Sequence, residues 1–304
     1  MLATRDGTVW ISNYHALDFW RKGKLSAIRS GQSLPGSNVT TFFEDHAGKL
    51  WVGIDNGLWV YANGAFRPVR HRDGTALGIV FAITEDTHHS IWVRAGRNLD
   101  RIYDSQLQEE RTSPQIATAY TLAANPQGGI FLGLVNGDLI QYADGKPQNY
   151  SSNASGSSHQ IRDLLVDPDG SVWGTTLDEA FRWKNGERKN LTTRNGLPCD
   201  GIFALVGDDQ HSLWLDSKCG LIKIDRSELE NWWSHPDTQI NFKLFDAFDG
   251  VQAGLTPLKP QATRSPDGRL WFVNGRILQM IDPEHLRETQ FRRPSRLKRS
   301  LRTD

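Results

Sequence analysis

A large aromatic residue recurs along this 304-residue chain at a nearly constant spacing. A short turn containing glycine or serine precedes each copy, and the gaps between successive copies are 41, 41, 39, 42, 41 and 57 residues. A period of this length indicates a repeated structural unit, and it constrains the architecture before any local pattern does. The seven marker residues are Trp10, Trp51, Trp92, Phe131, Trp173, Trp214 and Trp271.

The residues around each marker predict a meander of short strands. An alternating segment such as residues 39–44 comes first and is followed by a tight turn. In three copies this turn has Pro second and Gly fourth, as at residues 167–170, which is the preference of a type I turn. The aromatic strand, a second turn with glycine and a third strand such as residues 57–61 come next. A more polar outer strand, for example residues 65–69, fits in the remainder of the unit.

A single four-stranded unit cannot bury both of its faces, so the copies must stack on one another. Units of about forty residues favour closure around an axis, which leaves only short strand edges. We therefore predict an all-β, seven-bladed β-propeller over residues 1–286. The first blade is expected to be incomplete, because too few residues precede Trp10 to form its first strand. Such an open edge would invite self-association.

Composition excludes two classes of partner. The chain has 35 Lys and Arg against 35 Asp and Glu, so no basic field would hold a nucleic-acid backbone. No apolar run approaches the length needed to span a bilayer, so we expect no membrane insertion by this chain. Residues 1–7 lack the pattern of a secretion signal, so the chain expressed as given is expected in the cytoplasm.

The sixth copy resembles the repeat of the two-component regulator propeller family. The matching residues are the Gly-Leu-Pro and following strand at 195–205, the Leu-Trp pair at 212–215 and the Gly-Leu at 219–222. The resemblance implies the periplasmic sensor part of a histidine kinase, truncated before the immunoglobulin-like, membrane and kinase parts. It further implies a ligand-sensing module without a cofactor, which binds a small molecule or oligosaccharide at a mouth of the central channel. Such a chain is not expected to phosphorylate itself or to turn over a substrate.

The alternative is an enzyme that resembles the streptogramin lyases, whose repeats also carry an Asp-Gly turn before an aliphatic-Trp pair. Such an enzyme needs a general base and usually a metal that converge on the channel. The histidines of the turns lie on three different blades and are expected to be held apart, so we predict no metal site and no catalytic residues. These histidines are His46, His88, His89 and His211.

The two cysteines, Cys199 and Cys219, are expected to be neighbours. The turn between their strands is centred near residues 209–210, so an antiparallel register sets residue 199 opposite 219 or 220. That separation suits a disulfide. The alternative is a pair of reduced thiols.

The last residues, 287–304, form a basic tail that departs from the family pattern. A back-translation of residues 294–303 permits a shifted reading frame that resembles the family's next strand. We therefore expect the tail to be disordered or non-native, the product of a frameshift or a truncated gene.

Overall fold

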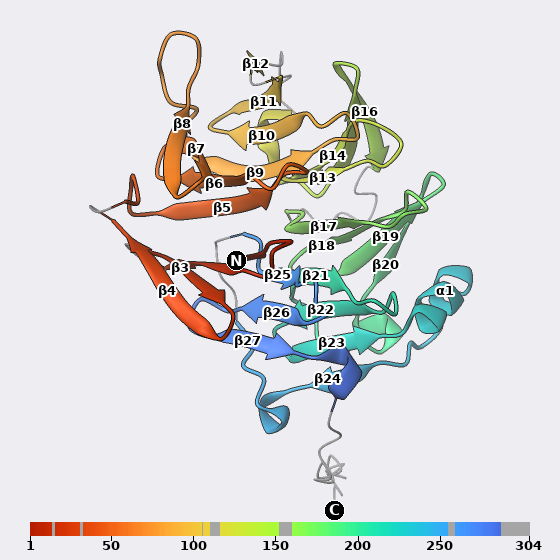
Figure 1. Cartoon of the computed structure of the whole chain (residues 1–304). Helices are drawn as coiled ribbons and strands as arrows, with labels where there is room; N and C mark the ends of the chain where they lie inside the picture. The colour runs from red at the N-terminus through yellow and green to blue at the C-terminus, as the bar shows by residue number, and fades with distance from the viewer. Residues whose placement is uncertain are drawn as a thin grey trace, which may run out of the picture.

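A computed structural model describes residues 1–13, 16–30, 33–104, 106–109, 116–151, 160–254 and 259–286. Within these residues the chain forms seven antiparallel sheets arranged as the blades of a ring (Figure 1). The predicted seven-bladed β-propeller is therefore confirmed. Each blade is a meander in which consecutive strands are hydrogen-bonded neighbours.

The strand bounds follow the predicted repeat closely. Blades 1 to 3 contain β1 Leu2–Ala3, β2 Val9–Asn13, β3 Ala16–Arg21, β4 Lys24–Arg29; β5 Val39–Glu44, β6 Leu50–Ile54, β7 Gly57–Ala62, β8 Ala65–Val69; and β9 Val80–Glu85, β10 Ile91–Ala95, β11 Asn98–Tyr103, β12 Gln106–Glu109. Blades 4 to 7 contain β13 Ala119–Ala124, β14 Ile130–Leu134, β15 Leu139–Ala143, β16 Lys146–Ser151; β17 Asp163–Val166, β18 Val172–Thr175, β19 Ala180–Lys184, β20 Glu187–Leu191; β21 Ile202–Gly207, β22 Leu213–Ser217, β23 Gly220–Ile224, β24 Lys243–Phe245; and β25 Ala262–Arg264, β26 Leu270–Val273, β27 Leu278–Ile281. Short 3₁₀ turns lie at Ile116–Thr118, Thr193–Asn195, Ala247–Asp249 and Pro283–His285.

The first blade is complete, so the expectation of a missing first strand was wrong. Leu2 and Ala3 pair with Trp10 and Val9 and form a two-residue innermost strand. Two residues suffice here because the neighbouring blade supports them: the Ala3 amide donates to Thr263 Oγ1 of β25 at 3.2 Å. Among the described residues it is the seventh blade that has three strands.

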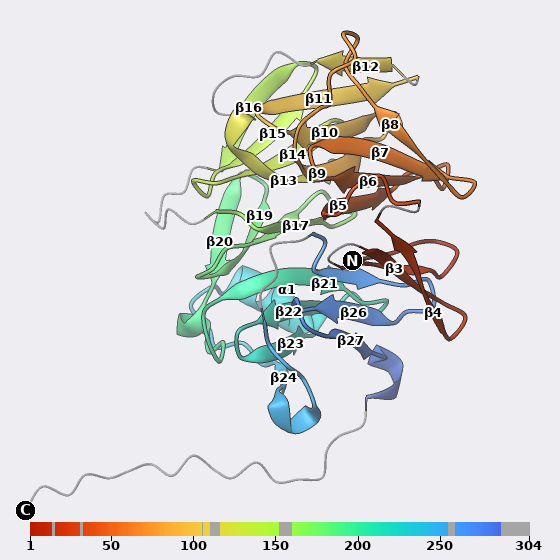
Figure 2. The same ribbon diagram turned by 90° about the vertical axis from the view of Figure 1, so that its left-hand side faces the viewer.

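Blades 1 and 7 meet and close the ring, as Figures 1 and 2 show in the red and blue strands. The Met1 ammonium donates to the Pro260 carbonyl at 2.9 Å, and the rings of Trp20 and Trp271 lie 5.4 Å apart.

The hydrophobic core is divided into clusters that lie between neighbouring blades. The cluster between blades 1 and 2, for example, joins Trp10 and Leu17 with Val39 and Phe42. Every marker aromatic is buried and packs against the next blade around the ring. The large ring at this strand position therefore serves blade packing.

An insertion in blade 6 accounts for the last, long gap of the repeat. Helix α1, Arg226–Ser234, lies between β23 and β24 and covers the junction of blades 5 and 6. Its Trp232 is fully buried and stacks on Trp173, with 5.9 Å between ring centroids. Glu230 accepts a hydrogen bond from Arg182 of β19 at 3.0 Å.

The predicted tail, 287–304, lies outside the described residues, so the boundary at residue 286 stays a prediction. No helix in the described ranges has the length and apolar character of a membrane span.

Candidate functional site: the turn face of the ring

The turns between the first and second strands of all blades lie on one face of the ring, because every blade has the same topology. We refer to this as the turn face. Within each turn an acidic or polar residue caps the backbone. Asp45 Oδ1, for example, accepts from the amides of Ala47 and Lys49 at 3.0 and 2.8 Å. These carboxylates therefore stabilise turns, as expected for residues that favour Asx turns.

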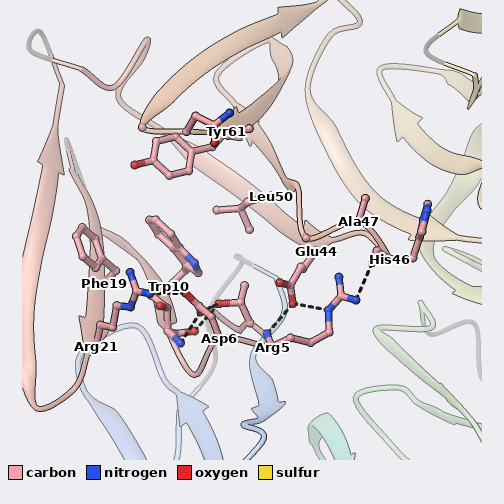
Figure 3. Close-up of a pocket in the computed structure, with 16 residues that line it drawn as sticks. Arg5, Asp6, Trp10, Phe19, Arg21, Glu44, His46, Ala47, Leu50 and Tyr61 are labelled. Carbon is pink, nitrogen blue, oxygen red and sulfur yellow. Dashed lines mark hydrogen bonds and ion pairs between the residues drawn. The ribbon is translucent and has the colours of Figure 1, made fainter.

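A pocket of about 720 Å³ opens on the turn face between blades 1 and 2 (Figure 3). We call it the Trp10 pocket. Trp10, Phe19, Leu50 and Tyr61 supply an apolar lining, with the Trp10 ring 5.1 Å from Phe19 and 5.5 Å from Tyr61. These side chains come from β2, β3, β6 and β7, so rigid strands hold the aromatic part of the pocket.

Charged side chains form the rim of the Trp10 pocket. The Arg5 amide donates to Glu44 Oε2 at 2.8 Å, and the Arg5 guanidinium donates to the carbonyls of Asp45 and His46. On the other side, Arg21 Nη2 lies 3.2 Å from Asp6 Oδ2.

The Asp6 carboxyl stays ionised at this rim. Burial alone would raise the pKa of Asp6, but hydrogen bonds from Thr8 and Thr4 and the charge of Arg21 lower it. The rim therefore offers fixed charges of both signs above the aromatic side chains.

A second pocket of about 820 Å³ lies between blades 2 and 3, and His46, His88 and His89 are among its lining residues. Here the structure corrects the prediction that the turn histidines are held apart. His46 of blade 2 and His89 of blade 3 stack with 3.8 Å between ring centroids, and both contact Glu85, the last residue of β9. Three potential metal ligands therefore come together where none was predicted.

The central channel encloses a smaller cavity of about 350 Å³, lined by the first strands of the blades. Lys259 enters it from the connection before β25, and its ammonium lies 3.8 Å from the centre of the Tyr120 ring and donates to the Arg162 carbonyl. Burial lowers the pKa of Lys259 to about 7, although Asp163 opposes this change. Burial likewise raises the pKa of Asp163. The channel cavity is therefore smaller than the Trp10 pocket, and fewer charged residues line it.

A disulfide joins Cys199 and Cys219, whose Cα atoms are 6.2 Å apart. Cys199 precedes β21 and Cys219 lies in the turn before β23, so the bond ties the start of the blade 6 meander to its second turn.

The spacing of the markers did not predict a pocket beside Trp10. The signal in the sequence is a further aromatic residue, Phe19, in the strand after the marker of blade 1. The sequence signal for the histidine cluster is that His89 stands where five of the other copies have glycine, at Gly7, Gly48, Gly128, Gly170 and Gly268.

The fold defines the chain as a seven-bladed β-propeller. Its larger pockets lie between blades on the turn face. A model of the family described as two component regulator propeller matches residues 33–56, which contain β5 and β6. In this repeat the chain is similar to the two-component regulator propeller family. A search of curated protein sequences found no match.

Several solved structures share the fold. The extracellular domain of the putative hybrid two component system BT3049 from B. thetaiotaomicron has a TM-score of 0.78 and 18% sequence identity. The alignment covers 92% of this chain but 38% of that chain, so the chain spans well under half the length of that protein domain. PorZ from Porphyromonas gingivalis has a TM-score of 0.58 and 14% identity, over 88% of this chain and 43% of that chain.

A lyase shares the fold over most of both chains. Catalytically inactive virginiamycin B lyase from Staphylococcus aureus, solved with quinupristin, has a TM-score of 0.69 and 12% identity. The alignment covers 91% of this chain and 92% of that one. At these identities the likenesses establish the propeller fold alone.

Proposed function

We propose that this propeller is the ligand-binding part of an extracytoplasmic two-component sensor, and that the ligand is a small molecule or oligosaccharide bound in the Trp10 pocket. The observation that carries the proposal is the combination of aromatic lining and charged rim in one cavity of about 720 Å³. Ligand pockets of this size are lined mainly by apolar and aromatic side chains, with a few polar groups that fix orientation.

The chemistry of the pocket suits a sugar. The rings of Trp10, Phe19 and Tyr61 offer flat apolar surface to the C–H face of a pyranose. Arg21, Asp6 and the Arg5–Glu44 pair offer charge-assisted hydrogen bonds to its hydroxyl groups.

Three observations support an extracytoplasmic site. The matching family model is that of a two-component regulator propeller, and the likeness to BT3049 is to an extracellular domain. A disulfide such as Cys199–Cys219 persists in oxidising compartments and is rare in the cytosol.

Thermal unfolding in the presence of a panel of oligosaccharides and small metabolites tests the proposal. A ligand that binds only the folded state raises the Tm, by the equivalent of about 2.7 kcal/mol at one hundred times its Kd. The Arg21→Gln variant should reduce this rise. It should itself fold normally, because the side chains of Arg21 and Asp6 are about half exposed and exposed ion pairs add little stability.

The matched control is Arg276→Gln, since Arg276 is exposed and lines none of the pockets described above. A ligand whose effect on the Tm is equal in the wild type and in Arg21→Gln would refute the Trp10 pocket as its site. A complete panel without any rise in Tm would refute ligand sensing.

Lyase activity is the second candidate, favoured by the likeness to virginiamycin B lyase over nearly the full length of both chains. Against it, the lining of the central cavity contains Asp163 and Lys259 but none of the histidines. We expect no turnover of a cyclic lactone antibiotic of the streptogramin B class, and measurable ring opening would make the enzyme the better assignment.

A further inference from the structure

We propose that His46, Glu85 and His89 form a binding site for a divalent transition metal such as Zn²⁺, which bridges blades 2 and 3. Each residue offers one ligand atom, and these three atoms lie within 4.8 Å of one another. Two imidazoles and a carboxylate are a ligand set that zinc binds at about 2.0–2.2 Å.

The separation between His89 and Glu85 fits tetrahedral coordination. Two ligands bound at about 2.1 Å in a tetrahedron lie about 3.4 Å from each other. His89 Nδ1 is 3.4 Å from Glu85 Oε1, and His46 Nδ1 contacts the same oxygen. A metal at this position therefore requires the His46 ring to move away from Glu85 Oε1.

Contacts from both neighbouring blades hold the ligands in place. Glu85 Oε2 accepts from the His46 amide at 2.7 Å, which leaves Oε1 directed at both imidazoles. On the other side, Arg5 of blade 1 donates to the His46 carbonyl at 2.8 Å. Ligands fixed in this way lose little freedom when a metal binds.

The backbone at His89 supplies an independent observation. His89 has φ of 61°, in the left-handed region where five other copies of the turn have glycine. A non-glycine residue in this region is uncommon, and such positions cluster at functional sites. Within the described ranges, His211 is the only other non-glycine residue at this turn position with a φ in the same range, and it does not belong to the metal-ligand group.

At two other junctions between blades, the corresponding contact pairs an arginine with a carboxylate. Arg5 lies against Glu44 between blades 1 and 2, and Arg264 Nη1 lies 2.6 Å from Asp209 Oδ1 between blades 6 and 7. Between blades 2 and 3, His46 occupies the place of Arg5, and His89 occupies the place of a glycine beside the same carboxylate. A metal ion bound there would supply the positive charge that the guanidinium supplies between blades 1 and 2. The imidazole side chains are 51% and 60% exposed, so further coordination positions face solvent beside the Trp10 pocket.

Isothermal titration calorimetry with Zn²⁺ on the complete chain tests the site. We expect one equivalent to bind the wild type, with at least a tenfold loss of affinity in His89→Gly, which corresponds to about 1.4 kcal/mol. This variant removes a ligand yet keeps the turn, because glycine favours a positive φ.

His211→Gly makes the same change at the same turn position of blade 6 and is the matched control, which should bind Zn²⁺ as the wild type does. A second variant, His46→Ala, should also lose binding. No heat of binding from the wild type, or equal affinity in wild type and His89→Gly, would overturn the proposal. Equal losses in His89→Gly and His211→Gly would assign the heat to scattered surface histidines and overturn it as well.

Discussion

The indole nitrogen of Trp214 donates a hydrogen bond to Asp208 Oδ2 at 2.9 Å, across the turn that joins β21 and β22. The same link, over six residues, recurs between Trp51 and Asp45 at 2.9 Å and between Trp92 and Asp86 at 2.7 Å. In blade 7 a serine takes the place of the acid, and Trp271 donates to Ser265 at 2.8 Å. The acid of the turn thus accepts from the aromatic marker as well as from the backbone.

We expect Asp208→Ala to destabilise the chain by about 1–3 kcal/mol, because it leaves the indole N–H of the fully buried Trp214 without its acceptor. The Asp208 carboxylate also accepts from the amides of Gln210 and Ser212, so part of the loss belongs to the turn. A double-mutant cycle with Trp214→Phe, measured by urea unfolding, separates the two contributions.

The cost of Asp208→Ala should be smaller in the Trp214→Phe background, since that background has no indole donor. Gln210→Ala, at the exposed position two residues further on, is the control and should change stability by less than about 0.5 kcal/mol. Equal costs of Asp208→Ala in both backgrounds would show that the indole bond adds nothing.

The repeat predicted the number of blades, because this number depends on the spacing of the markers along the chain. It did not predict that His46 and His89 meet. Their blades converge at the channel, so turns 41 residues apart in sequence become neighbours on the turn face. Nor did it predict Lys259 in the channel, since Lys259 and the Arg162 carbonyl to which it donates lie 97 residues apart in sequence. Contacts between blades depend on how neighbouring blades are placed around the ring, and the sequence pattern of one repeat does not determine that placement.

Reduction of the Cys199–Cys219 disulfide should destabilise blade 6. The bond closes a loop with a sequence separation of 20, for which the chain-entropy model gives about 3 kcal/mol. Urea unfolding with and without dithiothreitol measures the difference. The double variant Cys199→Ser with Cys219→Ser should be as unstable as the reduced wild type and insensitive to the reductant. Equal stability of the oxidised and reduced wild type would contradict this prediction.

Asp216 should make stability fall as the pH rises from acid to neutral. This residue of β22 is 3% exposed, and burial raises its pKa from 3.8 to about 7. Between these values the folded state holds a proton that the unfolded state has lost, so folding is favoured at low pH and the advantage disappears as pH approaches 7. The free energy of unfolding should fall by on the order of 4 kcal/mol over this pH range.

The Asp216→Asn variant cannot ionise, so it should match the wild type near pH 4 and exceed it in stability at pH 8. Urea unfolding at both pH values gives the difference. Asp237→Asn, at an exposed position after α1, is the control and should show no such change between the two pH values. If the wild type is as stable as Asp216→Asn at pH 8, interactions in the folded chain offset the burial of the ionised carboxylate. That result would contradict the prediction.

The outer edge of blade 7 is the place where we expect self-association. Among the described residues this sheet ends at β27, and Met280 in that strand is 47% exposed. An unpaired edge offers backbone hydrogen-bonding groups to another chain, and a lysine on the edge opposes such pairing. The wild type should therefore form dimers as its concentration rises, measured by sedimentation velocity, and Met280→Lys should stay monomeric. The control, Leu25→Lys, changes an exposed residue of β4 on blade 1 and should leave the dimer intact. A wild type that remains monomeric at every concentration would show that the edge is covered.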